Sequence, residues 1–175
     1  PGTALQLSNG TTVRYAQLFK CEQVLRSDCN RGVSGIDGST STAAGAACVG
    51  EGMTVLITGD MSFSYDVNGL SSTYLSPRFK IIVMCNGGGG IFRFIKPTSD
   101  LPELETCFEI HRDISVEKYA DLFGLRYFEL NDEKSAAEVL SLFFAEEDRP
   151  AILAVHTPNV YNAEVLRGYF RRSRQ

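Results

Sequence analysis

The residue types that bind a divalent cation and a phosphate occur in two short segments, residues 59–62 (Gly-Asp-Met-Ser) and 86–88 (Asn-Gly-Gly). Magnesium takes one or two carboxylates and completes its octahedron with phosphates, water and carbonyls, so Asp60 is a natural first ligand. The amides of Met61 and Ser62 would open a helix and point at an anion. Asn86 adds a neutral oxygen, and the glycines expose carbonyls. Together the two segments predict a site for a metal ion bound to a diphosphate.

Neither segment is specific by itself. Gly-Asp after a strand is also typical of a turn in which the aspartate caps a helix. The glycine run 87–90 is also typical of a flexible loop. The combination favours the metal site, because the two segments end consecutive predicted strands that a single helix separates.

The elements that would position these residues follow an alternating pattern. Short apolar runs ending in turn residues alternate with segments of helical period, which predicts βα units. We expect strands near 4–8, 22–27, 53–58, 79–85, 125–130 and 150–156. We expect helices near 11–19, 37–49, 64–75, 88–94, 115–123, 134–145 and 162–172. The fold class is therefore α/β, a doubly wound, mainly parallel six-stranded sheet flanked by helices.

The runs 54–57 and 80–84 are continuously apolar, as expected for central strands covered on both faces. Ligands of such sheets bind beyond the carboxyl ends of the strands. The polar, glycine-bearing strand ends are residues 8–10, 28–32, 59–62 and 86–90. The segment 95–112, with two prolines and no clear period, is expected to be a long loop, and loops of that length are often functional.

Size and composition set the remaining bounds. A chain of 175 residues with a net charge of −4 is one ordinary domain, and it favours neither nucleic acid nor an anionic membrane as a partner. The terminal arginines 167, 171, 172 and 174 are interpreted as a solvated helix end. Five cysteines without metal spacing fit reduced thiols, and the pattern contains no leader or membrane-spanning segment, so we expect a cytoplasmic protein. Because an apolar strand pattern follows Pro1 at once, we expect a piece of a longer protein.

The other reactive residue types are interpreted as structural. His111 and His156 have no partner at ligand spacing. Cys85 adjoins Asn86 but is expected to be a small packing residue, because a nucleophilic role needs a neighbouring base.

The chain resembles the thiamine-diphosphate enzymes, whose signature runs from Gly-Asp-Gly to Asn-Asn. Met61 replaces the third residue of that signature, and only one asparagine is present. The segments 30–45, 59–66 and 86–92 are similar to the menaquinone-pathway family that synthesises 2-succinyl-5-enolpyruvyl-6-hydroxy-3-cyclohexene-1-carboxylate. The resemblance runs from about Leu7 to the end and corresponds to the carboxyl-terminal third of that family, its diphosphate domain.

The resemblance implies a role for each matching residue. Asp60, Asn86 and the Gly88 carbonyl would bind Mg²⁺ or Mn²⁺, and Ile36 would wedge the cofactor into its bent form. Arg14 and Arg31 would meet substrate carboxylates, which also suits the bidentate chemistry of guanidinium. A structural ion pair is the alternative for each arginine. Ile91 and Phe92 would line the acceptor pocket. The complete set of expected cofactor contacts is Ser34, Gly35, Ile36, Gly59, Asp60, Met61, Ser62, Asn86, Gly88, Gly89 and Ile91.

The implied reaction is decarboxylation of 2-oxoglutarate followed by addition of the resulting carbanion to isochorismate. The resemblance also implies an activating glutamate on the amino-terminal pyrimidine-binding domain of a partner subunit, in a homodimer or homotetramer. We therefore expect the isolated chain to lack synthase activity. Two alternatives stay open: another thiamine-diphosphate enzyme, such as an acetolactate synthase or a 2-oxoacid decarboxylase, and a domain that acts chiefly in assembly.

Overall fold

The computed structural model contains one six-stranded sheet in which every strand pair is parallel, in the order β2-β1-β3-β4-β6-β5. It describes residues 2–20, 22, 24–109, 111–112, 114–145 and 148–172. The strands are β1 (Thr3–Leu7), β2 (Val24–Cys29), β3 (Thr54–Gly59), β4 (Phe79–Cys85), β5 (Arg126–Leu130) and β6 (Ala151–His156). The predicted fold class is confirmed.

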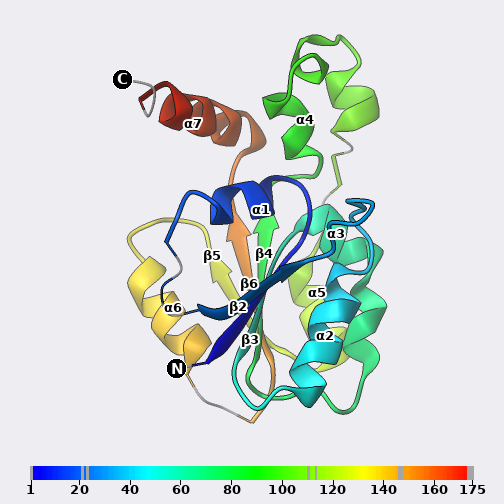
Figure 1. Cartoon of the computed structure of the whole chain (residues 1–175), viewed down its shortest axis with the longest axis vertical. Coiled ribbons are helices and arrows are strands. Elements are labelled where there is room, and N and C mark those ends of the chain that lie inside the picture. Colours follow the sequence, from blue (N-terminus) through cyan, green and yellow to red (C-terminus); the bar gives the residue numbers. More distant parts are fainter. Residues whose placement is uncertain are drawn as a thin grey trace.

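Helices cover both faces of this sheet (Figure 1). One face carries α2 (Ser39–Val49), α3 (Asp60–Tyr65) and α5 (Val116–Phe123), and the other carries α1 (Thr11–Ala16) and α6 (Ala136–Phe144). Beyond the carboxyl ends of the strands stand α4 (Gly90–Phe94) and α7 (Asn159–Arg172), which pack against each other (Figure 1).

The core is built from the continuously apolar strands. On the first face Leu56, Ile81 and Ile152 are fully buried under the alanines of α2 and the Phe63 ring. On the second face Phe143 is fully buried. At about 25 cal/mol per Å² of apolar surface, this two-sided burial is what holds the carboxyl ends of β3 and β4 side by side.

The prediction of a single helix near 64–75 was wrong. The chain turns into α3 at Asp60, directly after β3, and then forms a separate 3-10 turn, η1 (Val67–Ser71). Asp66 ends α3, and its carboxylate accepts hydrogen bonds from the Ser41 amide at 2.7 Å and the Ser41 hydroxyl at 2.6 Å. The site aspartate is therefore the first residue of a helix.

We expected the segment 95–112 to be a long loop, and it contains short ordered turns. It contains a 3-10 turn, η2 (Thr98–Asp100), and a π-helical turn, η3 (Leu104–Phe108). The Thr98 hydroxyl binds the carbonyls of Phe92 and Ile95, at 2.8 and 2.7 Å, so a short side chain supplies order that apolar periodicity did not reveal.

Two further findings concern membranes and cysteines. Within the described part of the chain, no helix is long and apolar enough to cross a bilayer. Cys29, Cys48, Cys85 and Cys107 are free thiols. Cys21, Arg174 and the side chain of Arg172, to which we assigned roles from the sequence, lie outside the described residues.

Candidate functional site

Asp60 lies at the centre of the candidate site. The register of β3 and β4 pairs Gly59 with Met84, so the ends of the two strands meet. The Asp60 side chain is almost fully buried, and one carboxylate oxygen accepts hydrogen bonds from the amides of Asn86 at 3.0 Å and Gly87 at 2.8 Å. The other oxygen accepts from the Met61 amide at 2.8 Å. A single carboxylate therefore fixes the loop that follows β4.

The loop at residues 86–90 requires its glycines. Gly87, Gly88 and Gly89 have φ values of +85°, +89° and +62°, a region that side chains disfavour. A Cβ on Gly89 would lie 2.4 Å from the Phe108 carbonyl oxygen. The Asn86 side-chain oxygen accepts from the Gly88 amide at 3.0 Å, which curls the loop back on itself. The loop is compact and leaves little room for movement against η3.

The donor set fits a hard cation. Among the described residues, no three His, Cys, Asp or Glu side chains come together as metal ligands, so a zinc-type site is not formed here. Asp60 supplies one buried carboxylate, and Asn86 and Gly88 supply neutral oxygens on the loop that Asp60 fixes. One carboxylate with neutral oxygens is the protein share of a magnesium site that phosphates complete. The ligand roles of these three residues remain a prediction.

The segment after β2 is held against the same edge of the sheet. The Asn9 side chain donates to the carbonyls of Asn30 and Gly35, at 2.7 and 2.6 Å, and accepts from Arg31 at 2.8 Å. Ser34 takes a left-handed conformation, with φ of +55°. Arg31 is thus anchored by the neutral Asn9 amide, which follows β1. Among the residues that the structure describes, it does not form the ion pair that was its structural alternative.

Ile36 and Ser62 are in contact. The Ser62 hydroxyl donates to the Ile36 carbonyl at 2.6 Å, which ties the expected wedge residue to the first turn of α3. The Ile36 side chain is 37% exposed, so it stands free of the core as a residue that contacts a ligand would. The segment 59–62 and the Ile36 segment, both predicted for the cofactor site, are therefore brought together.

The expected pocket wall, Ile91 and Phe92, lies on α4, where both side chains are partly buried. The Phe92 ring packs against Phe108 with centroids 5.3 Å apart. The wall is thus supported by η3, in the segment that the sequence left without structure.

Arg14 lies on α1, whereas Arg31 lies in the segment after β2. Arg14 is exposed on α1 and lines a groove with Phe94 of α4 and with Arg167 and Arg171 of α7. Within the described residues the Arg14 side chain makes no hydrogen bond or ion pair, so the structural ion pair considered for it is not formed there. The two predicted carboxylate-binding arginines approach the strand ends from different elements.

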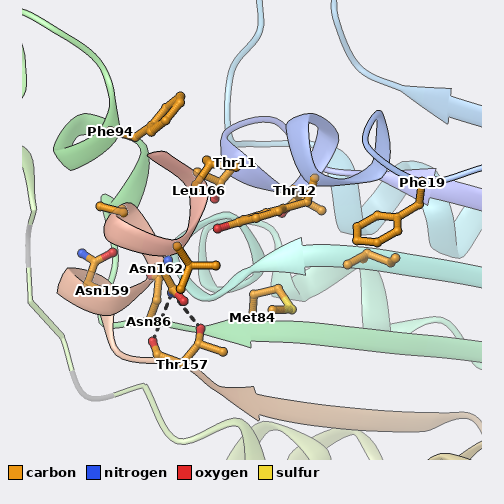
Figure 2. A pocket seen from close by; sticks show the side chains of 15 residues that line it. Thr11, Thr12, Phe19, Met84, Asn86, Phe94, Thr157, Asn159, Asn162 and Leu166 are labelled. Carbon is orange, nitrogen blue, oxygen red and sulfur yellow. Dashed lines mark hydrogen bonds between the residues drawn. The ribbon is translucent and has the colours of Figure 1, made fainter. Parts of the chain in front are cut away.

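A cavity of about 420 Å³ opens between α1, α4 and α7 beside Asn86 (Figure 2). Its floor is apolar, with Ile57 and Met84, and its polar lining includes Thr11, Thr12 and Asn159. We did not single out Thr11, Thr12 or Asn159 from the sequence. The available signal for Asn159 was its position after the end of β6 and after Pro158, a residue typical of helix starts.

Titratable groups gather at the neighbouring strand ends. Burial, and then the nearby Asp60 and Glu129 carboxylates, raise the pKa of the Cys85 thiol to about 12. His156 pairs with Glu129 at 3.0 Å, and the Tyr127 hydroxyl donates to the same carboxylate at 3.2 Å. These contacts agree with the interpretation of His156 as structural and of Cys85 as a packing residue.

Comparison with known proteins identifies the class to which this fold and site belong. Residues 9–155 match the family described as "Thiamine pyrophosphate enzyme, C-terminal TPP binding domain". The chain belongs to this family, and thiamine diphosphate is its cofactor.

Three similar proteins carry the name 2-succinyl-5-enolpyruvyl-6-hydroxy-3-cyclohexene-1-carboxylate synthase. The Porphyromonas gingivalis synthase is 48% identical over 168 residues, which are 95% of this chain and 29% of that protein. The Flavobacterium johnsoniae synthase is 45% identical over 95% of this chain and 30% of its own length. The Christiangramia forsetii synthase is 40% identical over 96% of this chain and 29% of its own length. This chain thus spans less than a third of these relatives.

Proposed function

We propose that this chain is the single diphosphate- and metal-binding domain of a 2-succinyl-5-enolpyruvyl-6-hydroxy-3-cyclohexene-1-carboxylate synthase, working in the cytoplasm. The observation that carries the proposal is the buried Asp60 carboxylate, which holds the loop at 86–87 through two amides at the ends of adjacent strands. The similarity to the named synthases supports the choice of this reaction within the class.

Asp60, Asn86 and the Gly88 carbonyl would hold Mg²⁺ or Mn²⁺, and Gly59, Met61, Ser62 and Gly89 would contact the diphosphate. When bound, thiamine diphosphate would supply the electron sink for decarboxylation. The protein supplies position. The Ser62 hydroxyl donates to the Ile36 carbonyl at 2.6 Å, and the Asn9 side chain donates to the Gly35 carbonyl at 2.6 Å. Ser34, Gly35 and Ile36 would contact the cofactor from this segment, with Ile36 pressed against it. Ile91 and Phe92 exclude water from the acceptor side.

The substrates of this proposal, 2-oxoglutarate and isochorismate, carry two carboxylates each. Arg31, oriented by Asn9 at 2.8 Å, would bind one carboxylate, and Arg14 would bind another from α1. A guanidinium group that is already oriented loses less side-chain entropy when it binds a carboxylate in the bidentate mode.

The remaining part of the site would come from outside this chain. We infer that the amino-terminal pyrimidine-binding domain of a partner subunit faces the carboxyl edge of the sheet, in a homodimer or homotetramer, and carries the activating glutamate. The length of the relatives, about three times that of this chain, leaves room for such a domain.

The test is a hybrid in which this chain replaces the matching segment of the Porphyromonas gingivalis synthase. We expect it to consume 2-oxoglutarate with isochorismate when thiamine diphosphate and Mg²⁺ are added. Asp60→Ala should abolish turnover, because it removes the charged ligand and the acceptor of two loop amides. Asp66→Ala is the matched control, since this carboxylate binds Ser41 at the start of α2 and should preserve turnover.

Circular dichroism and gel filtration would establish that each hybrid is folded and assembled. A folded hybrid that decarboxylates pyruvate but not 2-oxoglutarate would contradict the proposed substrate and favour another enzyme of the class. A folded hybrid without any thiamine-dependent turnover would leave assembly as the role of the domain.

A further inference from the structure

A fully buried glutamate lies behind the glycine loop. Glu109 follows η3, its side chain is 0% exposed, and both of its oxygens accept hydrogen bonds from Arg93 of α4. The hydrogen bond from the Arg93 Nε to Glu109 is 2.8 Å long. Hydrogen bonds to Glu109 and then to Glu105 raise the pKa of the Arg93 guanidinium above its usual range. Removing a charge from water is costly unless it is paired and hydrogen-bonded, so this pair is a specific feature of the fold.

Asn159 connects this pair to the loop. Its side-chain nitrogen, at the start of α7, donates to the Gly88 carbonyl at 3.1 Å and to a Glu109 oxygen at 3.0 Å. Both neighbours are acceptors only, which fixes which end of the amide faces them. The side-chain oxygen is buried, has no hydrogen-bond partner in the described residues, and faces Gly90, where a Cβ would lie 2.3 Å away.

The backing of the loop is rigid on its other side as well. Gly89 approaches the backbone of Phe108 and Glu109 too closely for any side chain. From α7, Arg167 donates to the Arg93 carbonyl at 2.6 Å. The end of β4, the segment after η3 and the start of α7 are therefore joined around the Gly88 carbonyl.

We propose that Asn159 and Glu109 are positioning residues that orient the Gly88 carbonyl toward the metal ion. This inference rests on the proposed function, in which Gly88 is a ligand through its carbonyl oxygen. That oxygen has two lone pairs, and the hydrogen bond from Asn159 occupies one and directs the other. Glu109 holds Asn159 in place, and Arg93 neutralises Glu109, so that no second anion competes with the diphosphate for the metal.

The alternative is that these residues only stabilise the fold. Glu105 separates the two possibilities, because it also pairs with Arg93, at 2.9 Å, but its side chain is 66% exposed and it does not bond to Asn159 or Gly88. Loss of such an exposed pair has little effect on stability. Glu105→Gln is therefore the matched control for Glu109→Gln.

The experiment measures Mn²⁺ binding by electron paramagnetic resonance, with thiamine diphosphate present and no substrate, in the hybrid enzyme described above. Groups that orient metal ligands typically contribute about 10- to 100-fold to metal affinity. We expect Asn159→Ala to weaken Mn²⁺ binding by about that factor, and Glu109→Gln by about 10-fold. The Mn²⁺ affinity of Glu105→Gln should stay within about twofold of that of the parent, the hybrid enzyme without these substitutions. Asn159→Ser, which keeps one donor, replaces Asn159→Ala if that variant does not fold.

Thermal unfolding without cofactor is measured in parallel. Lower unfolding temperatures with unchanged Mn²⁺ affinity would show a structural role and overturn the proposal. Equal losses of affinity in Glu105→Gln and Glu109→Gln would overturn it as well, and so would a folded parent that does not bind Mn²⁺. A parent that binds Mn²⁺ and thiamine diphosphate but lacks synthase turnover would contradict the proposed reaction alone.

Discussion

At the strand ends of this domain, neighbouring groups determine the hydrogen bonding and the reactivity of individual side chains. Asp60 is buried, and three backbone amides donate hydrogen bonds to its carboxylate. Cys85 is one residue from Asn86 but is surrounded by apolar groups and carboxylates. Proximity to the site therefore does not make Cys85 reactive.

The pKa of Cys85 leads to a prediction about alkylation. A thiol with a pKa of about 12 stays protonated at pH 8, and the thiolate is the nucleophile. Iodoacetamide at pH 8 should therefore modify the exposed Cys48 and Cys107 well before Cys85, as peptide mass spectrometry would show. Raising the pH toward the pKa should increase the rate at Cys85. Modification of Cys85 as fast as the exposed pair would refute the assignment.

At the level of secondary structure, the short helix α4 depends on contacts made by its neighbours. It has five residues and no fully buried side chain. A helix this short is not stable by itself in water. Its position is set by the glycine loop before it, by η3 beside Phe92 and by α7. The position of the expected pocket wall, Ile91 and Phe92, therefore depends on those contacts.

Gly89→Ala tests this dependence. The left-handed conformation disfavours alanine, and the new Cβ would meet the Phe108 carbonyl at 2.4 Å. We expect a loss of stability of at least about 1 to 3 kcal/mol in chemical denaturation. Gly45→Ala is the control, because Gly45 lies inside α2 with nothing within 4 Å of its Cβ position. That change should stabilise the chain by about 0.5 to 1 kcal/mol. If Gly89→Ala leaves the stability unchanged, the loop can move to accommodate the side chain.

Considered as a whole, the domain presents one functional edge. The carboxyl ends of β4 and β6 point toward α4 and α7 (Figure 1), and β3 lies beside β4. The cavity beside Asn86 opens between α1, α4 and α7. The amino ends of the strands lie at the opposite edge. Under the proposed function, this edge would contact one side of the cofactor.

The isolated chain should therefore bind thiamine diphosphate and Mg²⁺ weakly and lack synthase activity. If about 3 kcal/mol of cofactor contacts come from the partner domain, the affinity falls about 100-fold relative to the hybrid enzyme. Isothermal titration calorimetry on both proteins measures the difference. Equal affinities, or turnover of 2-oxoglutarate with isochorismate by the chain alone, would contradict the assignment of half a site to this chain.

The strands and the first set of site residues could be predicted because their signals are local. Continuous apolar runs identified β3 and β4, and the polar ends of those strands identified Asp60 and Asn86. The limits of α3 depended on a bond between Asp66 and Ser41, 25 residues away in sequence, which periodicity does not encode.

The support behind the Gly88 carbonyl was decided by the tertiary structure alone. Asn159 reaches Gly88 across 71 residues and Glu109 across 50. Both contacts exist because β6 lies next to β4, which brings the start of α7 against the glycine loop. The sequence determined which residue types stand at each strand end. The order of the strands determined which of them touch, because a hydrogen bond depends on positions in space and not on spacing along the chain.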